Sequence, residues 1–312
     1  SAESRLVMPE LLDEGLEPHK VSELYLVMSD KPNIAVDISA VWDQKVAALL
    51  HPAIDAGLNV IDTASAYLAS EQLLGRALVG RRDQVHLFTK CGATDGFSRS
   101  DWSARGIRSQ LEQSLRALKT DHVELLQLHS CGIDTLERGE AIDALETLKR
   151  EGKTRFIGYS GDGDAAVWAV TCGRFDALQT SINVADQLVL EQALPLAAKA
   201  SMGVIAKRPV ANVAWRSGEN GPDDSYHSSY WRRLRTLDFE FTKRPLKEAV
   251  GIALRFTAFQ PGLSTAIVGS SSPGRWAENA ALLEQGPLPA EEVTAIRTRW
   301  KERARPDWVG QQ

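Results

Sequence analysis

Short apolar runs recur along the chain and alternate with segments whose apolar residues follow helical spacing. One such segment carries Ile107, Leu111, Leu115 and Leu118 on one helix face. Strands joined by helical crossovers are parallel, and eight strand–helix units in 312 residues suit a (β/α)8 barrel, whose usual size is about 250 residues. We therefore predict an α/β fold, a TIM barrel with a C-terminal helix. The eight runs are Leu24–Met28, Leu58–Ile61, Val85–Thr89, Val123–Leu128, Thr154–Gly158, Ala177–Thr180, Gly203–Ala206 and Thr265–Val268.

The chain shows no linker, repeat or low-complexity tract, which indicates a single barrel domain over residues 1–312. An open doubly wound sheet is the alternative, but no Gly-x-Gly-x-x-Gly motif follows an early run. A long polar stretch follows the seventh run, from Asn212 to about Arg244, and we expect a long loop there. It is either a lid over a site or a loop packed on its own large side chains, which are Trp215, His227, Tyr230 and Trp231.

Composition and charge narrow the classes of partner. The chain is 43% hydrophobic and 25% charged, as in ordinary globular domains, and its formal charge of −5 argues against a nucleic-acid or anionic-membrane surface. We find no apolar stretch near the roughly 20 residues of a membrane span and no basic, apolar signal segment at the acidic N-terminus. We therefore expect a cytoplasmic protein that binds neither nucleic acid nor membrane. The sequence leaves its oligomeric state open.

The three cysteines, Cys91, Cys131 and Cys172, lack metal-ligand spacing and are typical of free thiols in a reducing compartment, so we expect no metal. Cys91 and Cys131 lie just past Lys90 and His129. They are either reactive thiols or packing residues at the rim of the barrel.

Four polar residues occupy the places where barrel enzymes carry their chemistry. Asp62, Lys90 and His129 each stand where an apolar run ends, and Tyr67 lies five residues past Asp62. A phenol has a pKa near 10, but a neighbouring ammonium favours its ionised form, and a carboxylate would keep that ammonium charged. An imidazole could then hydrogen-bond a substrate oxygen. Singly, each residue could be a cap, a solvated strand end or an ordinary half-buried side chain; together they predict a proton-donating site.

The loop after the eighth run indicates an anion site. Ser272 before Pro273 predicts an N-cap followed by proline at the first helical position. Glycine and serines before a helix N-terminus favour the binding of a phosphate. Arg275 could bind a further phosphate through two hydrogen bonds. The alternative is an ordinary capped helix with a surface arginine.

Several of these stretches resemble the aldo-keto reductase superfamily. The resemblance covers about residues 42 to 285 and rests on motifs in order: Gly57–Ala64 through Tyr67, Ser70-Glu71 through Leu74-Gly75, Leu87–Lys90, Leu125–His129, Gly152–Ser160 and Ile267–Asn279. It implies a (β/α)8 barrel that binds NADP(H) and a small-molecule carbonyl substrate. By that resemblance Tyr67 is the general acid, Asp62 and Lys90 tune it, and His129 orients the carbonyl.

The resemblance also implies a set of cofactor-binding positions. Ser160 and Gln179 fall where the family holds the nicotinamide carboxamide. The family holds the adenosine phosphate end at positions that are here Ser270, Arg275, Glu278 and Asn279. Among these, Arg275 favours NADPH over NADH. Lys207 or Arg208 stands where many members stack a tyrosine on the nicotinamide, and Gly269 replaces a common phosphate-binding lysine.

Two departures keep other functions open. The N-terminal segment, about residues 1–41, is divergent, and its run Leu24–Met28 lacks the family's glycine-rich turn beside the cofactor. Gly161 replaces the family's frequent asparagine. Bulkier side chains at the first run could crowd the nicotinamide and leave a nucleotide-sensing regulatory barrel with little turnover. A lyase or dehydratase that uses Tyr67 and Lys90 without net redox change is the other alternative.

Overall fold

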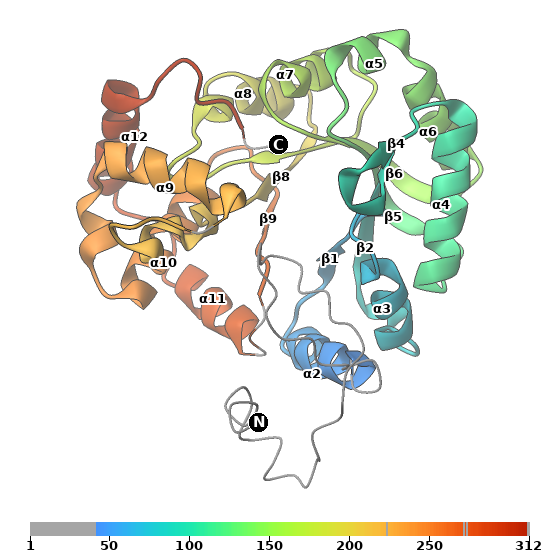
Figure 1. Cartoon of the computed structure of the whole chain (residues 1–312), viewed down its shortest axis with the longest axis horizontal. Coiled ribbons are helices and arrows are strands. Elements are labelled where there is room, and N and C mark those ends of the chain that lie inside the picture. The colour runs from blue at the N-terminus through green and yellow to red at the C-terminus, as the bar shows by residue number, and fades with distance from the viewer. Residues whose placement is uncertain (1–41, 223, 271, 273, 311–312) are drawn as a thin grey trace, which may run out of the picture.

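The protein is described by a computed structural model over residues 42–222, 224–270, 272 and 274–310 (Figure 1). These residues form a seven-stranded parallel sheet in the order β1-β2-β5-β6-β7-β8-β9. The strands are β1 (Val60–Asp62), β2 (His86–Cys91), β5 (Val123–His129), β6 (Thr154–Ser160), β7 (Ala177–Ser181), β8 (Gly203–Lys207) and β9 (Thr265–Ile267); a separate hairpin pairs β3 (Ala93–Thr94) with β4 (Arg99–Ser100).

All seven apolar runs within this part of the chain are strands, and most extend one or two residues beyond the predicted carboxyl end. The run Leu24–Met28 lies outside the described residues. Helices surround the curved sheet, so the predicted barrel architecture is confirmed, as is the C-terminal helix (Figure 1). The helices are α2 (Trp42–Asp55), α3 (Ser70–Ala77), α4 (Ala104–Leu118), α5 (Ile133–Arg138), α6 (Glu140–Arg150), α7 (Gly163–Thr171), α8 (Ala193–Lys199), α9 (Ser225–Leu237), α10 (Leu246–Ala258), α11 (Arg275–Leu283) and α12 (Ala290–Arg303).

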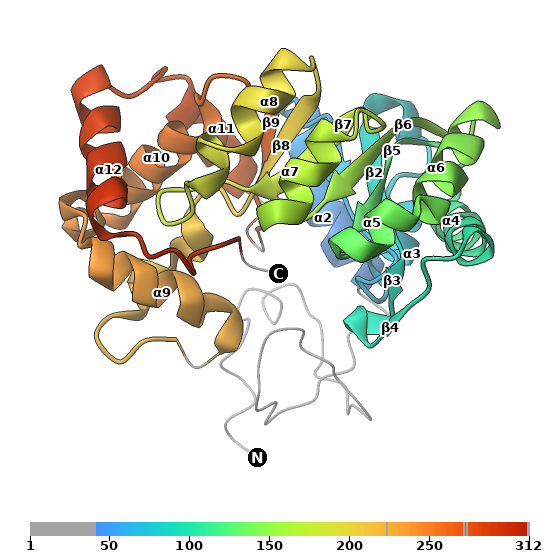
Figure 2. The ribbon, with the colours of Figure 1, turned by 90° about the horizontal axis from the view of Figure 1, so that it is seen from above.

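The prediction of a long loop from Asn212 to about Arg244 is wrong, because this segment contains a helix. Within it, α9 follows Asp224, whose side chain accepts a hydrogen bond from the His227 amide at 2.8 Å, while residues 211–217 and 240–243 form short 3-10 helices. One face of α9 is polar, and the opposite face is buried through residues at helical spacing, which are Tyr230, Leu234 and Leu237. That buried face packs with α10 and α12 into a second core at one side of the molecule, as Figure 2 shows.

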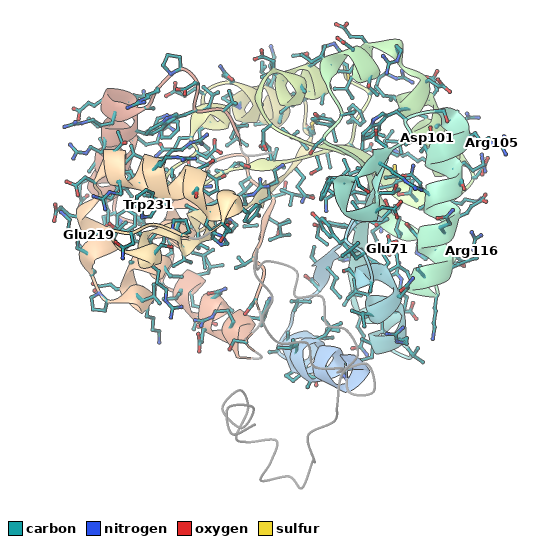
Figure 3. The ribbon with its side chains drawn as sticks, viewed as in Figure 1. Glu71, Asp101, Arg105, Arg116, Glu219 and Trp231 are labelled. Atoms are coloured by element: carbon teal, nitrogen blue, oxygen red, sulfur yellow. The ribbon has the colours of Figure 1, made fainter. Side chains whose placement is uncertain are left out.

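The aromatic side chains of this segment therefore belong mainly to packing. Tyr230 is fully buried in the second core, and Trp215 packs against it. Trp231 donates from Nε1 to the Gly218 carbonyl at 2.8 Å, and Figure 3 shows it beside Glu219 on the α9 side of the molecule. These contacts favour the packed-segment interpretation over the lid.

Strand alternation sorts the side chains of the sheet into two sets. Leu87, Leu126 and Leu178 face the helices in the main core, whereas Leu125, Ala177 and Ile205 form a separate small cluster with Phe88 and Ile267. Parallel register keeps this alternation in step, since Phe88 pairs with Leu125 and Lys90 with Gln127. Two residues beyond the small apolar cluster, toward the carboxyl ends of the strands, polar side chains replace apolar ones. They are Lys90, Gln127, Gln179 and Lys207.

Candidate active site

A buried ion pair lies at the centre of the polar layer. The Lys90 ammonium nitrogen is 2.5 Å from Asp62 Oδ2 and also donates to the Thr63 carbonyl oxygen at 2.9 Å. The Lys90 side chain is 1% exposed and that of Asp62 is 8% exposed. Because an unpaired buried charge is costly, each of these two groups fixes the position of the other.

Tyr67 and His129 lie beside this pair. The Lys90 ammonium is 5.1 Å from the centroid of the Tyr67 ring, and the Tyr67 and His129 rings meet edge to face with centroids 5.5 Å apart. Tyr67 is 40% exposed, whereas His129 is buried. The structure thus brings together all four residues singled out at the strand ends, with the phenol open to solvent and the ammonium enclosed. Phe97, in the loop between β3 and β4, covers His129 at a centroid distance of 4.8 Å.

The electrostatic surroundings keep His129 neutral. Burial lowers the pKa of His129 to about 2, and the cationic groups of Lys90, Lys207 and Arg208 add to this effect. A neutral imidazole carries one N–H donor and one acceptor nitrogen. Among the described residues, the buried Nδ1 of His129 has no hydrogen-bond partner. The neutral ring thus keeps one N–H that can act as a hydrogen-bond donor.

Two amides extend the polar layer across the sheet. Gln127 donates from Nε2 to Gln179 Oε1 at 2.8 Å, and Gln179 donates from Nε2 to Asp62 Oδ2 at 3.4 Å. Sequence reasoning singled out Gln179 but missed Gln127. The signal was present, because Gln127 lies two residues before His129 and therefore on the same face of β5.

A second buried carboxylate binds the cations at the end of β8. Asp162 lies 3.0 Å from the Lys207 ammonium and accepts hydrogen bonds from the Thr180 hydroxyl and the Ser181 amide. Burial alone would raise the pKa of Asp162, but the Lys207 ammonium and these hydrogen bonds outweigh it and hold the pKa below its usual value. Arg208 donates to Ser181 Oγ at 2.9 Å and to the Tyr226 hydroxyl at 3.1 Å. Sequence reasoning missed Asp162, although it directly follows the Ser160-Gly161 pair.

Ser160 ends β6 between two other site residues. It pairs in register with His129 on one side and with Gln179 on the other, and it is 1% exposed. Its carbonyl accepts a hydrogen bond from the Ser130 amide at 2.7 Å. The predicted carboxamide-binding residues Ser160 and Gln179 thus stand side by side at the carboxyl ends of neighbouring strands.

The loop after β9 differs from the prediction in where its helix begins. We expected Ser272 as the N-cap, but α11 begins at Arg275 with Gly274 as its N-cap residue, and Pro273 lies outside the described residues. The Ser272 amide donates a hydrogen bond to Ser270 Oγ at 3.0 Å.

The predicted phosphate-binding residues lie at the surface on this loop and helix. Arg275 is half exposed and forms an ion pair with Glu278 at 2.6 Å. Gly269 and Ser270 are exposed, and Asn279 is partly buried on α11. The guanidinium of Arg275 is therefore accessible to a ligand, with Glu278 as its competing partner.

The cysteines near the site are not activated. Cys91 and Cys131 are buried, and burial raises the pKa of both thiols, that of Cys131 to about 12. This favours the packing interpretation over reactive thiols. Within residues 42–310 as described, no group of three or more His, Cys, Asp or Glu side chains could hold a metal ion. No helix in that part of the chain is long and apolar enough to span a membrane.

Comparisons with known proteins agree with this fold. L-galactose dehydrogenase of Arabidopsis thaliana is 30% identical over 261 residues, which are 78% of this chain and 80% of the relative. An aldo-keto reductase of Bacillus halodurans in its holo form superposes with a TM-score of 0.72 at 28% identity, covering 85% of this chain and 90% of that one.

An aldo-keto reductase of Klebsiella pneumoniae in complex with NADPH superposes with a TM-score of 0.67 at 25% identity, covering 88% of this chain and 90% of that one. The family model described as aldo/keto reductase family matches residues 34–301, which is most of the chain. The barrel, the cluster at the strand ends and this match lead to one conclusion: the chain belongs to the aldo/keto reductase family of oxidoreductases.

Proposed function

We propose that this protein is an NADPH-dependent oxidoreductase that reduces an aldehyde or ketone to an alcohol, with Tyr67 as the general acid. The observation that carries the proposal is the enclosed Lys90–Asp62 ion pair beside a solvent-open Tyr67 and a neutral His129. The NADPH-bound relative of Klebsiella pneumoniae supports the choice of cofactor.

The residues present suit a nicotinamide dinucleotide. Ser160 and Gln179 offer hydroxyl and amide groups to a carboxamide. Lys207, at the end of β8, pairs in register with Ser181, and Arg208 donates to the Ser181 hydroxyl. At the surface, Arg275 would hold the adenosine phosphate, with Gly269, Ser270, Glu278 and Asn279 around it. When bound, the cofactor supplies the hydride.

The protein's own groups would act on the carbonyl oxygen. The neutral His129 donates a hydrogen bond to it, which stabilises the negative charge that develops as the carbonyl carbon is reduced. The Tyr67 hydroxyl donates its proton to that oxygen and gives the alcohol. The Lys90 ammonium, held by Asp62 and the Thr63 carbonyl, stabilises the phenolate left behind. Solvent can restore the proton because Tyr67 is 40% exposed.

The test is Tyr67→Phe, assayed with a panel of aldehydes and ketones by following NADPH consumption. Turnover is expected to fall on the order of 10²–10⁴-fold, the usual contribution of a general acid, while NADPH affinity is retained. Tyr159→Phe is the matched control, because the buried Tyr159 hydroxyl donates to the Cys131 carbonyl and lies on the core side of β6. Near-wild-type turnover of Tyr67→Phe would refute the assignment.

The same assay separates the alternatives. NADPH binding without turnover of any carbonyl would indicate a nucleotide-sensing barrel, and loss of substrate without NADPH consumption would indicate a lyase or dehydratase. The run Leu24–Met28, which raised the first alternative, lies outside the described residues.

A further inference from the structure

The ion pair of the site is flanked by two threonines whose side chains contact the helix layer. Thr63 directly follows Asp62, and Thr89 directly precedes Lys90. Successive side chains of a strand point to opposite faces, so with Lys90 facing Asp62, Thr89 faces the helices. Both threonines are fully buried. The residues that bind these threonines therefore contact the immediate chain neighbours of Asp62 and Lys90.

Glu71, in the first turn of α3, binds one of these threonines. Thr89 Oγ1 donates to Glu71 Oε1 at 2.6 Å, and Glu71 is 7% exposed. Figure 3 shows Glu71 in the space between α3 and α4. Burial raises the pKa of Glu71, against the opposing effect of hydrogen bonds from Thr89 and Ser114. A buried carboxyl that lost these partners would be strongly disfavoured, so the contact with Thr89 is held firmly.

Ser70, the neighbour of Glu71, binds the other threonine. The hydroxyl oxygens of Ser70 and Thr63 are 2.9 Å apart. Thr63 also offers the carbonyl oxygen that accepts from the Lys90 ammonium at 2.9 Å. The side chain of Ser70 is therefore one hydrogen bond away from a residue that contacts Lys90 directly. It makes no capping hydrogen bond of its own helix, for which Ala69 is the N-cap residue.

The helix that carries both residues is itself fixed in place. A Cβ added at Gly75 of α3 would lie 2.1 Å from the Ala117 carbonyl oxygen of α4, so the two helices touch backbone to backbone. Such a contact leaves α3 little freedom to slide or rotate on the sheet.

We propose that Ser70 and Glu71 are positioning residues: through Thr63 and Thr89 they set the place of Asp62 and Lys90 against Tyr67. Neither residue contacts the reacting atoms, because both act from the helix side of the sheet. The inference rests on the proposed function, in which the Lys90 ammonium must meet the ionising phenol. A displacement of about 1 Å in such a group can cost on the order of 10²-fold in rate.

The first test is Thr89→Val, which keeps the shape of the side chain and removes the hydroxyl. We expect kcat to fall about 10-fold or more, with the Kd for NADPH within about 2-fold of wild type, since misplacement affects the transition state and not cofactor binding. The solvent deuterium isotope effect on kcat should increase, because proton transfer from Tyr67 becomes slower. Thr89→Ser retains the hydroxyl and should restore kcat.

Thr154→Val is the matched control. Thr154 is also a buried strand threonine, and its hydroxyl donates to the Phe156 carbonyl at 2.7 Å, but it begins β6 at the opposite end of the sheet. Thr154→Val should lower the free energy of unfolding about as much as Thr89→Val does. Its kcat and solvent isotope effect should stay at the wild-type values. Equal kcat for Thr89→Val and Thr154→Val would overturn the proposal.

A second variant tests the other contact and covers the case in which Thr89→Val does not fold. Ser70→Ala removes only the bond to Thr63 and places a good helix former in α3. Ser70→Ala and Thr63→Val should each lower kcat several-fold, and the double variant should lose no more than either single one, as expected for one shared interaction. Wild-type kcat in Ser70→Ala, or full additivity in the double variant, would contradict the positioning role. Retained turnover in Tyr67→Phe would instead refute the proposed function itself.

Discussion

His129 should make the folded protein sensitive to acid in a predictable way. Its pKa is about 2 in the folded chain and 6.5 in an ordinary setting. Between these values the unfolded chain binds a proton that the folded chain does not, so stability falls as the pH falls below 6.5. From pH 7.5 to pH 5 the loss is about 2 kcal/mol, because the slope rises to about 1.4 kcal/mol per pH unit once the unfolded imidazole is protonated. Well above pH 6.5 the imidazole is neutral in both states, so the stability no longer changes with pH on its account.

The perturbation is His129→Asn, which removes the titrating group but keeps a neutral polar side chain. Urea unfolding at pH 7.5 and pH 5 would measure the free energy of unfolding of both proteins. The drop between the two pH values should be smaller in His129→Asn by about 2 kcal/mol. His86→Asn serves as the control, because His86 is exposed at the start of β2 and meets water in both states. The free energy of unfolding could instead fall equally in wild type and His129→Asn. That result would show that His129 takes up a proton in the folded state despite the nearby cations, and it would refute the prediction.

Two further predictions concern packing and cofactor choice. Gly75→Ala should lower the free energy of unfolding by about 1–3 kcal/mol, because its Cβ would lie 2.1 Å from a backbone oxygen of α4. Gly132→Ala is the control: its Cβ would meet nothing within 4 Å among the described residues, so the melting temperature should stay nearly unchanged. Arg275→Ala should weaken NADPH binding by about 1.5–3 kcal/mol and leave NADH binding almost unchanged in isothermal titration. An equal loss of both cofactors in Arg275→Ala would show that Arg275 serves the fold and not the choice of cofactor.

The strands and the first four site residues could be predicted from local sequence because both rest on short-range periodicity. An apolar run followed by Asp62, Lys90 or His129 marks the carboxyl end of a strand whatever its partners are. In a parallel sheet those ends meet at one edge, so clustering follows from the order of strands. The buried residues of α9 also show helical spacing in the sequence, at Tyr230, Leu234 and Leu237. The polar residues between them made this segment resemble a loop.

The partners of those residues could not be predicted, because they come from distant parts of the chain. Gln179 reaches Asp62 across 117 residues, and the Asp162 carboxylate meets Lys207 from a different strand.

By itself, the sequence determined which side chains stand at the carboxyl ends of the strands, since strand periodicity is a local property of the chain. Only the tertiary structure decided their electrostatic state and their support. His129 is neutral because burial and three cations from other elements act on it together, and Lys90 is held because α3 binds a threonine beside each member of its ion pair. Both effects depend on distances across the fold, and burial and Coulomb interactions change steeply with such distances.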